Sequence, residues 1–221
     1  MKDLVVYGTG GLGRQVVQLV SDINADHEIW RVLGYLDDAP EKAGTLIAGL
    51  PVHGSAAWLL SFPDVHVALA IGNPVSRRRT QLRLEALSHK RWATVVHPSA
   101  IVGSRCRIGD GTLICAGTVI DPDVHLGDFT LVNSLCCVSH DCRIGEFATL
   151  APGVRLAGRV QVGQGCELGI GSMAIQSLSI GEWSIIGAGA VVIDDLDPNV
   201  TAVGVPAKII KRRSPGWHLD V

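Results

Sequence analysis

An apolar residue recurs at every sixth position from 102 to 192, and this regularity limits what the chain can fold into more than any other feature. All sixteen positions of the series are apolar without a shift of register, and eight of the residues that follow them are glycine. Val102-Gly103 and Ile144-Gly145 are examples. A six-residue period is typical of a parallel β-helix, in which each hexapeptide supplies one short strand and one corner of a triangular coil. Three hexapeptides close one turn, so the pattern predicts about five turns, stacked about 4.8 Å apart.

The residue two positions before each interior residue is usually small, and four of the six cysteines occupy this slot. They are Cys106, Cys136, Cys142 and Cys166. Cys137 should point outward, because neighbouring residues of a strand face opposite ways. We therefore expect cysteines packed in an interior and no metal site. His140 lies two residues past the interior Val138, so it should sit at a corner and point outward.

Residues 1–96 follow a different pattern, in which strand-like and helix-like segments alternate. An apolar run at 4–8 predicts a buried strand, and Val16, Val20 and Ile23 follow it at helical spacing. Further strands are predicted at 31–38 and 66–73, and a second helix at 76–87. We expect two domains: a small βα sheet over residues 1–96, and the β-helix with its C-terminal tail over residues 97–221.

Composition excludes several classes of protein. Of the 221 residues, 47% are hydrophobic and 18% charged, and the formal net charge is -2, so the chain is neither disordered nor a typical nucleic-acid binder. No apolar run approaches the roughly 20 residues that a membrane span needs, and the start resembles a strand and turn more than a signal peptide. We expect a cytoplasmic protein with reduced cysteines.

Several motifs, in their order along the chain, resemble one family. They are GTGGLG (8–13), LDD (36–38), AIGN (70–73), HPSA (97–100), VNSLCCVSHDCRIG (132–145), LAPG (150–153), IIGAGAVV (185–192) and VGVPAKII (203–210). The chain resembles bacterial sugar acetyltransferases, which include enzymes that N-acetylate UDP-4-amino sugars and sialic-acid O-acetyltransferases. The resemblance implies a Rossmann-like βα domain, then a left-handed parallel β-helix, with acetyl-CoA as co-substrate.

The resemblance implies that His140 is the general base, together with Asn133 and Asp141. Acetyl transfer to an amine or hydroxyl requires removal of a proton from the attacking atom, and a histidine with a pKa of about 6.5 suits that task. Asp141 could orient the imidazole. Amino-sugar members carry an acid directly before this histidine, where this chain has Ser139, so the sequence leaves open which group orients His140. The alternative is an ordinary surface histidine.

Coenzyme and substrate contacts are also implied by the resemblance. The positions that match coenzyme contacts are Thr149, Gly158, Ile170 and Ala188, with Lys208, Lys211 and Arg212 near its phosphates. Thr149 stands where a relative has a histidine. The positions that match substrate contacts are Gly10, Gly11, Leu12, Asp37, Asp38, Gly72 and Asn73, and Leu12 stands where histidine is common. Alternatively, Gly158, Ile170 and Ala188 are ordinary repeat residues, and the three basic residues belong to a solvated face.

The glycine loop has a competing interpretation. Gly8, Gly10 and Gly13 form a GxGxxG pattern after a strand, and Asp37 follows at the distance of a dinucleotide fingerprint. However, about 96 residues hold only half of a doubly wound domain, so the resemblance favours a nucleotide-sugar, whose phosphates suit a helix start.

We therefore expect an acetyltransferase that N-acetylates a nucleotide-linked amino sugar during surface-glycan precursor synthesis. Two alternatives remain open: O-acetylation of sialic acid or another sugar, and an inactive nucleotide-sugar-binding scaffold. The joint presence of Asn133, His140 and Asp141 favours an enzyme. A homotrimer is expected, since a groove between two coils gives the coenzyme walls that one convex prism lacks.

Overall fold

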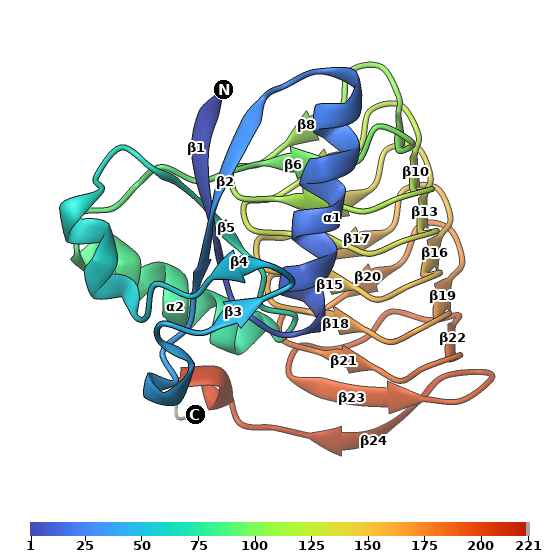
Figure 1. The fold of residues 1–221 in the computed structure, drawn as a ribbon. Helices are drawn as coiled ribbons and strands as arrows, with labels where there is room; N and C mark the ends of the chain where they lie inside the picture. Colours follow the sequence, from blue (N-terminus) through green and yellow to red (C-terminus); the bar gives the residue numbers. More distant parts are fainter. Residues whose placement is uncertain (220–221) are drawn as a thin grey trace.

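A small parallel sheet and a triangular coil of short strands make up the computed structural model, which describes residues 1–219 (Figure 1). The sheet has the order β2-β1-β5. Its strands are β1 (Lys2–Tyr7), β2 (Trp30–Leu36) and β5 (His66–Leu69); its helices are α1 (Gly11–Asp26) and α2 (Pro74–Ala86), and β3 (Leu46–Ile47) pairs with β4 (Leu50–Pro51). The described residues also form three 3-10 segments: η1 (Pro40–Lys42) and η2 (Ala56–Ser61) between β2 and β5, and η3 (Trp217–Leu219) after the coil.

The predicted strands and helices of the first domain are present with shifted bounds, and the strand predicted at 31–38 ends at Leu36. The strand predicted at 66–73 ends at Leu69, and α2 begins at Pro74, before the predicted residue 76. The reason is a local helix cap: the Asn73 side chain accepts a hydrogen bond of 2.9 Å from the Ser76 N–H, and Pro74 suits a first helical position.

The coil has three flat sides, which we name by what they present. The apolar side comprises β7 (Ile101–Val102), β10 (Val119–Ile120), β13 (Cys137–Val138), β16 (Arg155–Leu156), β19 (Met173–Ala174) and β22 (Val191–Val192). The polar side comprises β8 (Arg107–Ile108), β11 (His125–Leu126), β14 (Arg143–Ile144), β17 (Gln161–Val162) and β20 (Ser179–Ile180). The covered side, on which the first domain lies, comprises β6 (Val95–Val96), β9 (Leu113–Ile114), β12 (Leu131–Val132), β15 (Thr149–Leu150), β18 (Glu167–Leu168), β21 (Ile185–Ile186), β23 (Val200–Val203) and β24 (Lys208–Arg212).

Strand partners lie eighteen residues apart, as the hexapeptide pattern predicts. Val119 pairs with Cys137 in parallel, and the same shift recurs on the other two sides. The apolar side has six strands, so the coil has about six turns rather than the five predicted. The difference arises at the ends, where β6 joins before the periodic series starts and β23 pairs with β21 after it ends. Within residues 1–219, no helix is long and apolar enough to span a membrane.

Cysteines fill small slots inside the coil, as predicted for Cys136, Cys142 and Cys166. All three are buried in the core, and each thiol donates to a backbone carbonyl, such as Cys142 Sγ to Ala157 O at 3.2 Å. Burial raises the pKa of the Cys142 thiol to about 11, which keeps it protonated near neutral pH. Cys106 packs against the same core, while Cys137 is half-buried on the outer face of β13.

The first domain is tied to the coil by apolar packing and by one buried arginine. Side chains of α1 share a core with Leu113 and Leu131 of the covered side. Arg77 of α2 is 1% exposed and reaches carbonyl groups of the coil. The coil's hydrogen bonding begins at β6, at the end of the domain predicted to stop at residue 96.

Glycines at the corners permit the close stacking of turns. A Cβ added at Gly127, Gly145 or Gly163 would lie 2.5 Å from a backbone nitrogen of the next turn, closer than real contacts allow. The corner glycines are therefore required by the spacing between turns.

Gly145→Ala should destabilise the protein by about 1–3 kcal/mol, the usual range for overpacking a tight interior. Its Cβ would meet the Gln164 backbone nitrogen, which belongs to the next turn and cannot move alone. Gly11→Ala is the matched control, because a Cβ there meets no described atom within 4 Å. Urea unfolding of both variants measures the difference, and equal stability would contradict this view of the corners.

A second stabilising contact lies where β1 and β2 end. Asp37 accepts hydrogen bonds from the Thr9 hydroxyl and from Lys42 Nζ, the latter at 2.9 Å. Burial alone would raise the pKa of the Asp37 carboxyl, but the hydrogen bonds from Lys42 and Thr9 outweigh it and lower the pKa to about 2.

Asp37 should therefore make stability depend on pH in the acid range. A lowered folded-state pKa stabilises the protein above the unfolded pKa of about 3.8, and this contribution is lost as the pH falls from about 4 to about 2. Its size is about 2 kcal/mol. Unfolding free energies of wild type and Asp37→Asn at pH 7, 4, 3 and 2 should converge at low pH, and a constant gap would refute the assignment.

Candidate active site

His140 lies at the corner between the apolar and polar sides, between β13 and β14, and points outward as predicted. Its side chain is 52% exposed, and its Nδ1 lies 2.8 Å from Asp141 Oδ2. Asp141 has a φ of 60°, a left-handed conformation that Asp tolerates better than most residues. With the proton on Nδ1 directed to the carboxylate, Nε2 keeps its lone pair for a substrate. Within one chain, the carboxylate that hydrogen-bonds to His140 is thus Asp141, the residue that follows it in the sequence.

The backbone of the next turn of the coil packs against His140 and holds it in place. A Cβ added at Gly158 would lie 2.6 Å from both Cε1 and Nε2 of His140, so the ring lies directly against this glycine. The Arg159 N–H donates to the His140 carbonyl at 2.9 Å. His140, Asp141 and Gly158 therefore form one cluster.

Other predicted residues lie at a different corner. Asn133 sits between the covered and apolar sides, at the other end of the apolar side from His140, and its Nδ2 donates to Leu150 O at 3.2 Å. Ile170 and Ala188 share that corner and are exposed. Within one chain the structure does not bring Asn133 next to His140, although the sequence groups them.

Thr149 lies on the covered side, beneath the first domain. It is 6% exposed; its hydroxyl donates to Gly72 O at 2.9 Å and accepts from Arg77. The hydroxyl is thus occupied by contacts within the chain. A coenzyme contact through other atoms of Thr149 stays a prediction.

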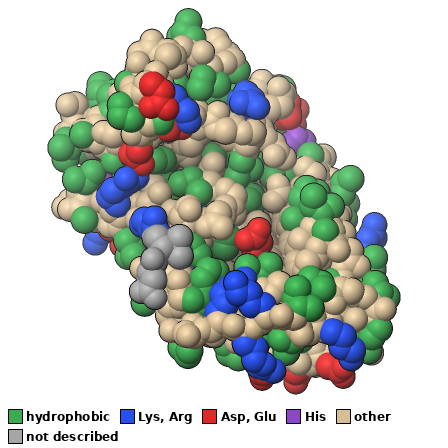
Figure 2. All heavy atoms as spheres, turned by 90° about the horizontal axis from the view of Figure 1, so that it is seen from below, with side chains coloured by type: hydrophobic (Ala, Val, Ile, Leu, Met, Phe, Trp, Pro, Cys, Tyr) green, Lys and Arg blue, Asp and Glu red, His purple; other side chains and the backbone are tan. Residues whose placement is uncertain are grey.

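Basic residues lie at the C-terminal end of the coil. Lys208 and Lys211 are exposed on β24, and Arg212 forms an ion pair of 2.7 Å with Asp197. Figure 2, the view onto this end, shows Lys and Arg side chains spaced over the surface rather than gathered in one patch. Their role toward phosphates stays a prediction.

The GxGxxG glycines divide into two kinds. A Cβ at Gly8 would lie 2.7 Å from Ala70 O, and one at Gly13 would lie 2.0 Å from Gly8 O, so these two glycines allow close packing. Gly10, Gly11 and Gly72 meet no described atom within 4 Å and border open space. This space lies beyond the carboxyl ends of β1 and β5, at the start of α1, where free backbone N–H groups suit an anion.

The remaining predicted substrate residues are used partly within the domain. Asp37 binds Thr9 and Lys42, and Asp38 accepts from Tyr7 Oη at 2.7 Å and pairs with Arg83. Leu12 is half-buried against the core, and Asn73 caps α2. Their contact with a substrate stays a prediction.

Sequence reasoning missed two features that the structure adds. Gln15 Nε2 of α1 lies 3.4 Å from Ser134 Oγ, which places a polar pair beside Asn133. Arg77, inside the run RRR, looks like a solvated helix residue but is buried. Only the tertiary contacts distinguish it from its neighbours.

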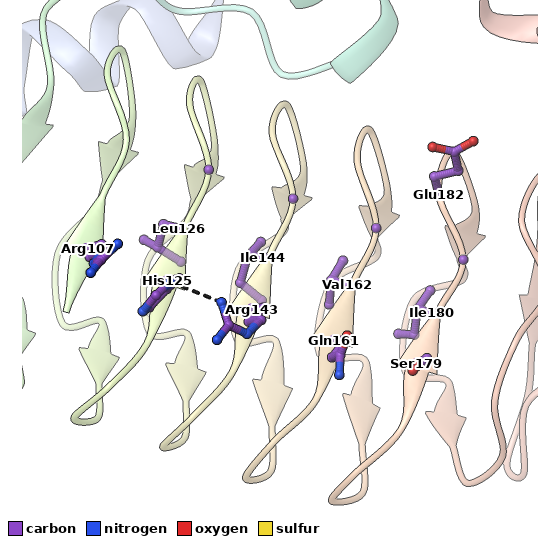
Figure 3. A pocket seen from close by; sticks show the side chains of 14 residues that line it. Arg107, His125, Leu126, Arg143, Ile144, Gln161, Val162, Ser179, Ile180 and Glu182 are labelled. Atoms are coloured by element: carbon purple, nitrogen blue, oxygen red, sulfur yellow. Dashed lines mark hydrogen bonds between the residues drawn. The ribbon is translucent and has the colours of Figure 1, made fainter. Parts of the chain in front are cut away.

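A shallow groove of about 530 Å³ runs along the polar side, toward the corner that this side shares with the covered side, where Gly127, Gly145, Gly163 and Gly181 line it (Figure 3). Arg107, His125, Arg143, Gln161 and Ser179 form a ladder along it, and Arg143 Nη1 lies 3.3 Å from His125 Nδ1. Within residues 1–219, no three His, Cys, Asp or Glu side chains converge to hold a metal ion.

Comparisons with known proteins agree with this architecture. Residues 3–84 match the family model of the PglD N-terminal domain. A curated relative, UDP-N-acetylbacillosamine N-acetyltransferase of Bacillus subtilis (strain 168), is 35% identical over 129 residues, which span 52% of each chain. The chain thus matches about half the length of this relative.

Solved structures extend the likeness to nearly the whole chain. PerB from Caulobacter crescentus, in complex with CoA and GDP-perosamine, has a TM-score of 0.85 and 33% identity, and the match covers 96% of this chain and 98% of PerB. The acetyltransferase domain of PglB from Neisseria gonorrhoeae FA1090, in complex with acetyl coenzyme A, has a TM-score of 0.84 and 29% identity, covering 95% and 99%. The predicted fold class, a βα domain followed by a left-handed β-helix, is confirmed. The chain therefore belongs to the bacterial sugar acetyltransferases that join a PglD-type N-terminal domain to a left-handed β-helix.

Proposed function

We propose that this protein transfers the acetyl group of acetyl-CoA to the amine of a nucleotide-linked amino sugar in surface-glycan precursor synthesis. The observation that carries the proposal is the pairing of His140 with Asp141 at an exposed corner, against the backbone of Gly158. The complexes of PerB with CoA and GDP-perosamine and of PglB with acetyl coenzyme A support the choice of substrates.

In this proposal His140 Nε2 takes the proton of the amine as its nitrogen attacks the acetyl carbonyl. The carboxylate of Asp141 holds the Nδ1 proton and stabilises the imidazolium that forms. Acetyl-CoA supplies the acetyl group as a thioester, and its thiol is released. The glycine loop at Gly10 and Gly11 would bind the diphosphate of the nucleotide through backbone N–H groups.

We infer further that each active site lies between two chains. In a triangular coil, the corner with His140 is opposite the covered side, so the first domain of the same chain lies on the far side of the coil from it. The proposed coenzyme positions divide in the same way, with Gly158 at one corner and Ile170 and Ala188 at the other. One molecule can contact both sets only where the corner of one chain meets the opposite corner of its neighbour.

The apolar side suits this contact with a second copy. Its outward side chains include Ile101, 64% exposed, and Met173, 44% exposed, and the corner beside it carries Leu135, 68% exposed. Burying three such sides around a threefold axis gives a closed trimer. If that axis is parallel to the coil axis, equivalent residues of all chains lie at the same height along the coil. His140 of the neighbour would then come level with Asn133 and the adjacent Gln15–Ser134 pair.

His140→Ala should lower turnover by roughly a hundred- to ten-thousand-fold, the usual loss for a general base. Binding of CoA and the melting temperature should stay near wild type, because the exposed corner side chain contributes little to packing. Release of free thiol from acetyl-CoA, measured with a panel of UDP- and GDP-linked amino sugars and of sialic acids, tests both the base and the acceptor class.

The matched control is His125→Ala, which removes another outward histidine of the coil and should keep turnover near wild type. Thiol release only with sialic acids would support O-acetylation instead. Nucleotide-sugar binding without thiol release from any acceptor would identify an inactive scaffold.

Mixed trimers test whether the site is shared. His140→Ala lacks the base, and Asp37→Ala should weaken nucleotide-sugar binding in the first domain far more than CoA binding. If each site combines the first domain of one chain with His140 of another, co-refolding the two inactive variants in equal amounts should restore roughly one quarter of wild-type activity by random assembly. No restoration in trimers verified by light scattering would mean that each chain works alone, and a monomer at micromolar concentration would exclude the trimer.

A further inference from the structure

Arg77 is a fully buried cation in the first turn of α2, at the junction of the two domains. Its guanidinium donates to six oxygens, which are Phe129 O (2.9 Å), Phe147 O (2.7 Å), Ala148 O (3.2 Å), Thr149 Oγ1 (2.9 Å), Ile71 O (2.6 Å) and Gly72 O (3.0 Å). All six are neutral carbonyl or hydroxyl oxygens. Within residues 1–219, no carboxylate forms an ion pair with Arg77.

The carboxylate of Glu167 on β18 attracts Arg77 through space but forms no ion pair with it. Burying a charge without a directly paired counter-ion is unfavourable unless hydrogen bonds replace its water. Apolar residues already join the domains, since Leu113 and Leu131 pack in one core with α1. A residue kept only for adhesion between the domains would therefore be better served by another apolar side chain. What a guanidinium adds is a planar fork of five N–H donors, which fixes direction as well as distance.

The contacts of Arg77 join the loop after β5 to the coil. Ile71 and Gly72 follow Ala70, whose carbonyl packs against Gly8 of the glycine loop, whereas Phe147, Ala148 and Thr149 lead into β15 of the covered side. A second bond runs in parallel, because the Thr149 hydroxyl donates to Gly72 O at 2.9 Å. The loop after β5, which packs against the glycine loop, is thus fixed to one particular turn of the coil.

We propose that Arg77, with Thr149 as its partner, is a positioning residue that sets the height along the coil at which the glycine loop of the first domain presents the nucleotide-sugar. The inference rests on the proposed function, because the height matters only if a bound sugar must reach a histidine on the coil. Since turns are about 4.8 Å apart, a slip by one turn would carry the amine out of hydrogen-bond reach of the base.

Arg77→Met tests the proposal, because methionine fills much of the space but donates no hydrogen bond. We expect nucleoside diphosphate, measured with UDP and GDP by calorimetry, to bind about tenfold more weakly, while CoA affinity changes less than twofold. Turnover with the nucleotide-sugar should fall at least tenfold, and the KM for acetyl-CoA should stay unchanged. Arg79→Met, an exposed arginine of the same helix, is the matched control and should behave as wild type.

A role confined to stability would lower the melting temperature of Arg77→Met but leave nucleotide affinity and turnover of the folded protein intact, and this result would overturn the proposal. Equal losses for nucleotide and CoA would also overturn it. If Arg77→Met does not fold, Thr149→Val removes one bond of the pair and should weaken nucleotide binding and turnover by about threefold without affecting CoA. Unchanged nucleotide affinity in Thr149→Val would then refute the proposal.

The two proposals fail in different ways. Wild-type protein that releases no thiol with any sugar would contradict the proposed function, whereas the nucleotide affinities of Arg77→Met and Thr149→Val still report on the position of the loop. Wild-type protein that binds neither UDP nor GDP would contradict both.

Discussion

The stacking of one turn of the coil on the next is the constraint on which the rest of the structure depends. Backbone hydrogen bonds such as Gly145 N–H to Val162 O, 2.8 Å, join each turn to the one eighteen residues later. This close spacing leaves no room for a Cβ at the corner glycines, while the interior accepts only apolar or small side chains. A side chain two residues past an interior residue, as His140 is past Val138, therefore points outward and stands on a rigid backbone. His140 gains its orientation in this way, from Gly158 on one side and Asp141 on the other.

A filled triangular prism also determines where chemistry can take place. Its interior is packed with side chains, and its surface is convex, so a substrate must be enclosed by something placed against an edge or a side. The first domain covers one side and the apolar side is exposed, which leaves the histidine with a single wall in an isolated chain. The separation of Gly158 from Ile170 and Ala188 follows from the same shape, since residues six or twelve positions apart in the repeat occupy different corners, whereas residues eighteen apart share one.

Wherever the repeat controls the backbone, the sequence was a sufficient guide. The interior cysteines and the outward position of His140 follow from counting in sixes, because the side-chain direction is fixed by the slot. Prediction failed where local or long-range contacts override the pattern. The strand expected at 66–73 is cut short by the Asn73 cap. The sequence also does not reveal that a full side of the prism separates Asn133 from His140 within one chain. The two kinds of glycine in GxGxxG are also indistinguishable until the packing around them is known.

The sequence by itself determined the coil, its period, its interior and the outward corner position of the histidine, because a period of six leaves the backbone few alternatives. The tertiary structure decided how the first domain packs against the coil. Arg77 stands in a run of three arginines, and nothing in that run marks it as the buried one. Its backbone partners on the coil are carbonyls of residues about fifty to seventy positions away, and a carbonyl is present at every residue whatever its side chain. Which carbonyls meet the guanidinium depends only on how the domains pack, so that contact is absent from the sequence pattern.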